Sequence, residues 1–218
     1  MSRLNYTFQA FQKDHFWLPV AVMGLFMLIT LLMTGDRQYS VVRAFLGFTL
    51  PLLAGGLSAY TFLEDSALEL QFATKRPAWK MIAERLGLVL FVIVFVSLTF
   101  QLFIQLLGVS LSPLGNVFQR QLVWFVPCLT TLVLGGAVSL MARNSNGGMA
   151  AVGGLWIIQI LLRGWFAREP VWRNVLLFYG VMDPLGQPRI LNQITLTVFS
   201  LLLLVAAHTL LKKQERYI

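Results

Sequence analysis

Hydrophobic residues form long continuous runs along this chain, and the connections between them hold nearly all of the charged residues. A helix needs about 20 residues to cross the hydrocarbon core of a bilayer, and five of the six runs are of that order. The runs are continuously apolar, whereas strands of membrane barrels alternate over about ten residues, so the pattern predicts helices. The six predicted spans are Phe16 to Met33, Ala44 to Phe62, Leu86 to Val109, Leu122 to Met141, Gly148 to Leu162 and Ile190 to Leu211.

The composition also indicates an integral membrane protein. Of the 218 residues, 57% are hydrophobic and 12% are charged, and the mean hydropathy is +0.74. A soluble domain carries about 25% charged residues, so a water-soluble globule is excluded. The fold class predicted for residues 1 to 218 is a single all-α integral membrane domain with six transmembrane helices. The fifth span is short and is expected to reach the interface by extending through Arg163 to Trp165 and Phe166, because arginine and aromatic side chains suit the headgroup level.

The net charge is +8, from 17 basic and nine acidic residues. The arginines are scattered at span ends and connections, which favours anchoring at lipid headgroups over binding of nucleic acid. Placing both termini in the cytoplasm puts all five lysines inside, as the positive-inside rule requires. We therefore predict a multi-pass protein of the cell (inner) membrane. The outside would hold seven arginines: Arg37, Arg43, Arg120, Arg163, Arg168, Arg173 and Arg189.

The inner connection from Leu63 to Arg85 is highly charged. At the helical period, Leu68 and Phe72 form an i,i+4 apolar pair away from the stripe expected to face the membrane. Acidic residues border this pair: Glu64, Asp65 and Glu69. An apolar knob with a charged rim suits docking into a soluble partner. An amphipathic linker lying on the headgroups explains the periodicity equally well.

The outer connection from Arg163 to Arg189 is also unusual. Its apolar stretch, Val171 to Met182, is too short to span and has the length of a re-entrant or interfacial segment. We expect it to turn back into the outer leaflet.

Small residues recur inside three predicted spans and predict close helix packing, within the bundle or between subunits. They are Ala54, Gly55, Gly56, Ser58 and Ala59 in the second span, Gly135, Gly136 and Ser139 in the fourth, and Ala150, Gly153 and Gly154 in the fifth.

Catalytic motifs are sparse. Gly148 and Gly153 have the spacing of a phosphate-binding loop, but Gly154 and Leu155 stand where that loop needs Lys and Ser or Thr. The chain is therefore expected not to hydrolyse ATP, and its scattered His and Cys residues predict no metal site. Ser58 and His208, on separate spans, leave an intramembrane serine protease as a remote alternative.

The layout resembles the type-2 ATP-binding-cassette (ABC) permease family, the membrane subunits of type V exporters. Six spans in about 220 residues, a charged inner helix between spans two and three and an outer re-entrant segment before the last span are similar to that family. The inner segment Leu63 to Pro77 is similar to its coupling helix, and the charged tail Leu211 to Arg216 to its usual ending. The family often has Gly-Thr or Gly-Ser where this chain has Ala67-Leu68.

This resemblance implies a permease, in an exporter, that works with two ATPase subunits and a second permease, identical or different. ATP and Mg would be bound by the ATPases, and this chain would hold no cofactor. The coupling helix would seat in a groove of the ATPase through Glu64, Asp65, Leu68, Glu69 and Phe72. Residues 1 to 15 would form an amphipathic interface helix against membrane lipids. The alternative is a non-transporting membrane scaffold or assembly subunit, which would lack ATPase docking.

Overall fold

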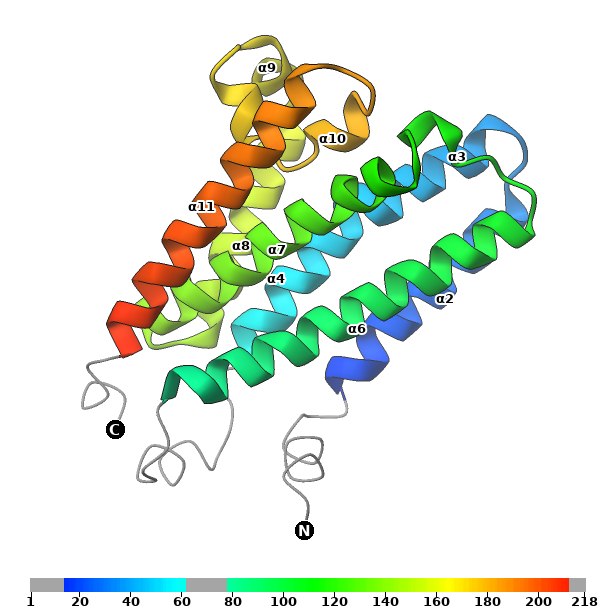
Figure 1. The fold of residues 1–218 in the computed structure, drawn as a ribbon. Helices are drawn as coiled ribbons and strands as arrows, with labels where there is room; N and C mark the ends of the chain where they lie inside the picture. The colour runs from blue at the N-terminus through cyan, green and yellow to red at the C-terminus, as the bar shows by residue number, and fades with distance from the viewer. Residues whose placement is uncertain (1–13, 62–77, 212–218) are drawn as a thin grey trace.

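The structure is a computed structural model that describes residues 14–61 and 78–211. Every regular element in these ranges is helical, which confirms the all-α prediction for the described chain (Figure 1). Residues 1–13, the greater part of the predicted docking segment and the charged tail lie outside the described residues.

Four helical stretches are long and apolar enough to cross a membrane: Asp36–Thr61, Ile82–Leu106, Val117–Ala142 and Pro188–Leu211. They correspond to the second, third, fourth and sixth predicted spans. The first and fifth predicted spans correspond to shorter apolar helices, Phe16–Leu32 and Ser145–Leu161. The helices that make up this bundle are α2 (Asp14–Leu32), α3 (Asp36–Arg43), η1 (Ala44–Thr49), α4 (Leu50–Thr61), α6 (Ala78–Leu106), α7 (Val117–Ala142), α8 (Ser145–Leu161) and α11 (Pro188–Leu211).

These helices run alternately up and down in one bundle (Figure 1). The end of the bundle where α2 begins and α11 finishes is called the lower end, after its place in Figure 1. The opposite end, which carries α3, α9 and α10, is called the upper end. Helix α4 ends and α6 begins at the lower end. Both ends of the chain's described part therefore lie on one side of the bundle, as the predicted topology requires.

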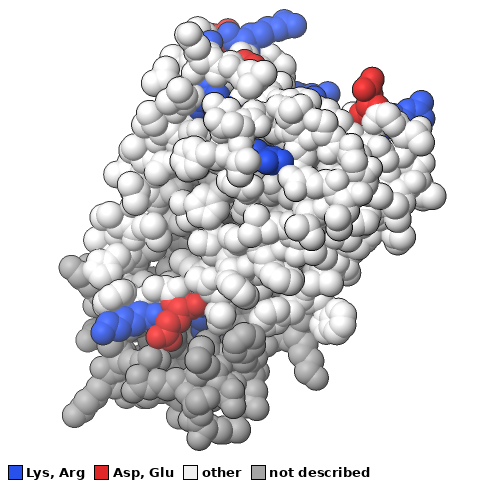
Figure 2. Space-filling view, turned by 45° about the vertical axis from the view of Figure 1, so that its right-hand side comes forward, with Lys and Arg blue, Asp and Glu red and all other residues white. Residues whose placement is uncertain are grey.

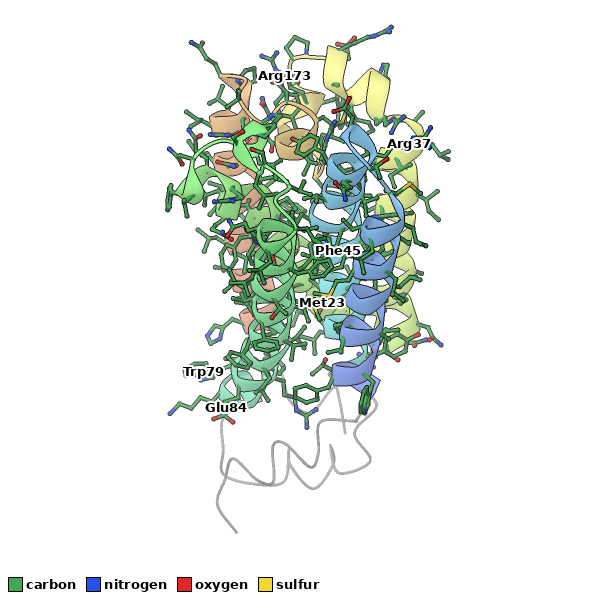
Figure 3. All side chains as sticks on the ribbon, turned by 90° about the vertical axis from the view of Figure 1, so that its right-hand side faces the viewer. Met23, Arg37, Phe45, Trp79, Glu84 and Arg173 are labelled. Carbon is green, nitrogen blue, oxygen red and sulfur yellow. The ribbon has the colours of Figure 1, made fainter. Side chains whose placement is uncertain are left out.

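Charged side chains are confined to the two ends of the described helices. Figure 3 places Glu84 at the lower end and Arg37 and Arg173 at the upper end, with Met23 and Phe45 between them. The face in Figure 2 is white between these ends, as expected for a surface in contact with hydrocarbon. Large apolar side chains such as Leu28, Phe91 and Leu202 are more than half exposed on this middle band.

Helix α7 is the centre of the packing, as the small residues of its sequence predict. A Cβ added at Gly135 would collide with the backbone oxygen of Gly55 and would lie 2.6 Å from the Ser58 hydroxyl. Close approach of α4 and α7 therefore depends on the absence of a side chain there. Gly153 and Gly154 of α8, by contrast, have open space around them.

Hydroxyl groups join α4 to α7 inside this contact. Thr131 Oγ1 donates to the Pro51 carbonyl (2.6 Å), and Ser58 Oγ donates to the Leu132 carbonyl (2.6 Å). Ser139 Oγ donates to the carbonyl of Ala59 (3.0 Å). Each hydroxyl is satisfied without water, as a buried polar group must be.

A π-helical turn, η1, precedes Pro51 in the second predicted span. Proline lacks an N–H, so a wider turn just before it accommodates the missing backbone hydrogen bond. The carbonyl of Phe48 in this turn accepts a hydrogen bond from Trp156 Nε1 of α8 (2.8 Å). Phe45 of the same turn lies between Phe26 of α2 and Phe100 of α6, with ring centroids 5.1 and 4.2 Å apart.

The connections at the upper end form a cap of short helices. They are α9 (Arg163–Arg168), η3 (Trp172–Val175) and α10 (Tyr179–Met182). Helix α8 ends at Leu161, so the fifth predicted span does not continue straight into Trp165 and Phe166. The Trp165 ring instead packs against Phe166 and Trp172, with centroids 5.1 and 5.7 Å away.

Candidate functional site

The lower end frames the segment predicted to dock an ATPase. The five predicted docking residues, Glu64, Asp65, Leu68, Glu69 and Phe72, lie outside the described residues, so their role stays a prediction. The described chain stops at Thr61 of α4 and resumes at Ala78 of α6, which belongs to the predicted inner connection from Leu63 to Arg85. The predicted connection to Arg85 is shorter than expected, because residues 78–85 already belong to α6.

Arg85 joins the two helices that flank this segment. Its guanidinium Nη1 donates to the carbonyl of Thr61 (2.8 Å), and the side chain is buried. The last carbonyls of a helix lack intrahelical donors and carry the negative end of the helix dipole, so a cation is favoured there. The C-terminus of α4 and the first turns of α6 are thus held together by a buried hydrogen bond.

The start of α6 also packs against the ends of α7 and α11. Ile82 of α6 shares a buried cluster with Leu140 of α7 and Leu211 of α11. Trp79 meets the His208 ring edge-on, with centroids 6.2 Å apart, and Lys80 Nζ lies 5.7 Å from the Trp79 ring centroid. The flanks of the docking segment are therefore connected to most of the bundle.

Ser58 and His208, the pair considered for a serine protease, each have other neighbours. The Ser58 hydroxyl is fully buried and donates to the carbonyls of Gly55 (3.0 Å) and Leu132 (2.6 Å). His208 is exposed and packs on Trp79. Activation of a serine requires a base that accepts its proton, and the Ser58 proton is directed at backbone carbonyls.

Amide side chains inside the apolar helices pair with one another or with backbone. Gln101 of α6 and Gln121 of α7 exchange hydrogen bonds of 3.0 and 3.3 Å, and Trp124 Nε1 donates to Gln121 Oε1 (2.8 Å). In the described ranges 14–61 and 78–211, no three His, Cys, Asp or Glu side chains converge as a metal site would need.

The predicted re-entrant stretch turns into the upper end of the bundle. Leu176, Leu177 and Phe178 are buried there, and the Phe178 ring lies 4.5 Å from the Phe48 ring of η1. The side chain of Val181 fills the space above Gly47, where a Cβ would collide with it. Residues 176–182 thus form a plug between η1, α7, α8 and α11. The position of a membrane relative to this plug stays a prediction.

Two buried amides hold the backbone of this plug. Gln159 of α8 accepts from the Leu177 N–H (2.8 Å) and donates to the Val175 carbonyl (3.2 Å). Asn192 Nδ2 of α11 donates to the carbonyls of Arg173 (3.0 Å) and Leu176 (2.9 Å), and also to that of Asn174 (3.1 Å). Without these amides, irregular backbone in an apolar site would be unsatisfied.

Tyr179 and Asp183 lie at the outer edge of the plug. The Tyr179 hydroxyl is 3.2 Å from Asp183 Oδ2 and donates to it. Burial raises the pKa of Tyr179; the hydrogen bond to Asp183 and its negative charge raise this pKa further, and the charge of Arg173 opposes the shift. Tyr179 is therefore neutral and a hydrogen-bond donor at physiological pH.

Replacing Asn192 by Leu is expected to loosen the plug and lower the free energy of unfolding by about 2 kcal/mol, because one buried and two partly buried carbonyls lose their donor. Hydrogen exchange at residues 173–178 should accelerate. The adjacent Gln193→Leu is the matched control, since Gln193 Nε2 has no hydrogen-bond partner. Equal exchange in the two variants would contradict the role assigned to Asn192.

The sequence analysis missed Gln159, Asn192 and Arg85. The signal for the first two was present, because an amide inside a predicted span must find a partner when water is absent. Arg85 was assigned to a solvated connection, although it is 8% exposed.

In its described residues the protein is therefore an all-helical protein, with four helices long and apolar enough to span a membrane. Comparisons of the chain with protein-family models, with curated proteins and with solved structures found no match.

Proposed function

We propose that the chain is a membrane permease subunit of an ABC transporter of the exporter type. Separate ATPase subunits hydrolyse ATP, and two permeases, identical or different, carry the substrate across or out of the membrane. The predicted coupling segment supplies the ATPase contact through Leu68 and Phe72, with the acidic rim of Glu64, Asp65 and Glu69.

The observation that carries this proposal is the hydrogen bond from Arg85 to the Thr61 carbonyl. A coupling segment must pass force from a soluble motor into the membrane helices. The segment is held between two helices that are joined by this buried contact, and its flanks pack on α7 and α11 through Ile82 and its neighbours. A linker that only lay on the headgroups would need no such buried tie.

The arrangement of the helices also supports the proposal. Six apolar helices, four of them of full spanning length, run up and down, and the described chain starts and finishes at the end where α4 ends and α6 begins. Helix α2 has 19 residues and helix α8 has 17, and a span needs at least about 17, so the lengths of both helices are compatible with a six-span permease.

Co-purification tests the proposal. If a gene for a P-loop ATPase lies beside the gene for this chain, the full chain, tagged and expressed with that ATPase, is expected to yield a detergent-stable complex with two ATPase subunits. ATP hydrolysis in this complex should differ from that of the ATPase alone, because assembly couples the two subunits. Purification of the full chain without any nucleotide-hydrolysing partner would instead favour the scaffold alternative.

A further inference from the structure

Unpartnered buried polar atoms gather at the upper end of the bundle. In the described residues, six buried side-chain nitrogen or oxygen atoms have no hydrogen-bond partner, and all six belong to residues at the upper end of the bundle. They are the Nε atoms of Arg43, Arg120, Arg173 and Arg189, Asn174 Oδ1 and Gln193 Nε2. Nearly all buried polar groups in proteins are paired, so such a concentration at one place requires an explanation.

We propose that Arg43, Arg120, Arg173 and Arg189 form a binding site for the phosphate group of an anionic ligand at the upper end of the bundle. The proposal does not depend on the transport function proposed above. It rests on where these four side chains lie, on their charge and on their Nε atoms, which are buried and have no hydrogen-bond partner.

All four arginines border the plug and the turn that follows it. Arg189 donates through Nη1 to the Pro184 carbonyl, and it is only 6% exposed. Arg173 belongs to η3, whose backbone is bound by Asn192, one helical turn along α11 from Arg189. Arg173 also lies only three residues before Leu176, the first residue of the plug.

The other two arginines approach from η1 and α7. Val181 of the plug packs on Gly47, and Arg43 lies one turn before Gly47, towards the upper end. A Cβ at Gly180 would be 3.7 Å from Val123 Cα, and Arg120 lies one turn before Val123. Residues three and four apart share a helix face, so Arg43 and Arg120 lie above the plug on the faces that contact it.

The arginines lack counter-charges. No ion pair joins any of the four to an acidic residue of the chain's described part, and Asp183, the carboxylate at this edge, accepts the Tyr179 hydroxyl. The upper end holds seven arginines and three acidic residues, Asp36, Glu169 and Asp183. A guanidinium in a partly desolvated place without an anion is costly, and an external anion removes that cost.

Phosphate fits this set of donors. The planar guanidinium presents paired N–H groups that match two oxygens of a phosphate, and its charge strengthens each hydrogen bond. Arg43, Arg120 and Arg173 are half-buried, so part of each side chain remains accessible. The phosphate could belong to a phospholipid headgroup or to a free solute, and both present the same oxygens.

The test uses the full chain in neutral detergent, titrated separately with a short-chain phosphatidylglycerol and with inorganic phosphate. The variant is Arg120→Gln combined with Arg173→Gln, because neither side chain makes a hydrogen bond that holds the described fold. The control is Arg163→Gln combined with Arg168→Gln, two exposed arginines of the same end with the same change in charge. Equal thermal unfolding of the two variants establishes that both are folded.

We expect the first variant to bind about tenfold more weakly or worse, and the control to stay within about twofold of the unchanged chain. Asp183→Asn should tighten binding, because it removes the carboxylate beside the site. Binding of phosphatidylglycerol alone identifies a headgroup site, and binding of inorganic phosphate as well identifies a site open to solutes. Equal losses in variant and control, or no binding of either probe, would overturn the proposal.

Discussion

Replacement of Phe72 by Asp is expected to abolish coupling to the ATPase while the helical bundle stays folded. Phe72 and Leu68 form the predicted apolar contact of the docking segment. Loss of a central aromatic contact costs about 2 kcal/mol or more, roughly 30-fold in affinity, and the buried carboxylate of the aspartate adds to this. The measurements are the amount of ATPase that co-purifies with the variant and the effect of the variant on ATP hydrolysis.

Ser66→Asp is the matched control for Phe72→Asp. It adds the same charge to the same segment, but at the helical period Ser66 lies away from the face of Leu68 and Phe72. We expect this control to retain the complex. If Phe72→Asp assembles and stimulates ATP hydrolysis as the unchanged chain does, the docking face has been assigned to the wrong side of the segment.

Gly135→Ala is expected to lower the free energy of unfolding by about 3 kcal/mol, near the upper limit for overpacking of a buried contact. The new methyl group would collide with the Gly55 carbonyl oxygen and crowd the Ser58 hydroxyl. Backbone cannot move aside as a flexible side chain can, so α4 and α7 must separate. The hydroxyl-to-carbonyl hydrogen bond from Ser58 to Leu132 would weaken with them. Unfolding by SDS in mixed micelles measures the loss.

Gly154→Ala provides the control for this substitution. It makes the same chemical change inside a helix, but nothing lies within 4 Å of the added Cβ. We expect its stability to be unchanged or to rise by up to about 1 kcal/mol, since alanine is the better helix former. Similar losses at Gly135 and Gly154 would mean that helix propensity, and not the contact of α4 with α7, controls the effect.

Hydropathy predicted the helices of this fold because a span must be continuously apolar over a fixed length. The ends of the helices were less predictable. Helix α6 begins at Ala78 and not near Leu86, and the second predicted span begins at Asp36 and not at Ala44. Polar residues at the headgroup level continue a helix without continuing the apolar run, so composition cannot mark where the helix starts.

The pattern of small residues predicted which helix faces pack closely, but it did not predict which helix each face contacts. Gly55, Ser58 and Gly135 lie in the contact between α4 and α7, whereas Gly153 and Gly154 have open space around them. The choice depends on the three-dimensional order of the helices, which periodicity does not contain. The hydrogen bond from Trp156 to the Phe48 carbonyl of the π-helical turn was unpredicted for a related reason, because the two residues are 108 positions apart in the sequence.

The candidate site was predictable only in part. The sequence predicts an amphipathic coupling segment. The hydrogen bond from Arg85 to the Thr61 carbonyl, which joins the helices on either side of it, was not predicted. The seven upper arginines were predicted to share one side of the membrane, and in the fold they lie at one end of the bundle. Four of them have buried Nε atoms without a hydrogen-bond partner, and this could not be predicted from their spacing.

The long separation between α4 and α7 in the sequence has a consequence for synthesis in the cell. The acceptors and donors that join these helices are 74 to 80 residues apart. At about 5–20 residues per second, a ribosome completes the α7 half of this contact roughly 4–16 s after the α4 half. During that interval α4 lacks its contact with α7. In the folded bundle the Ser58 hydroxyl also donates to the Gly55 carbonyl of its own helix, a hydrogen bond that does not require α7.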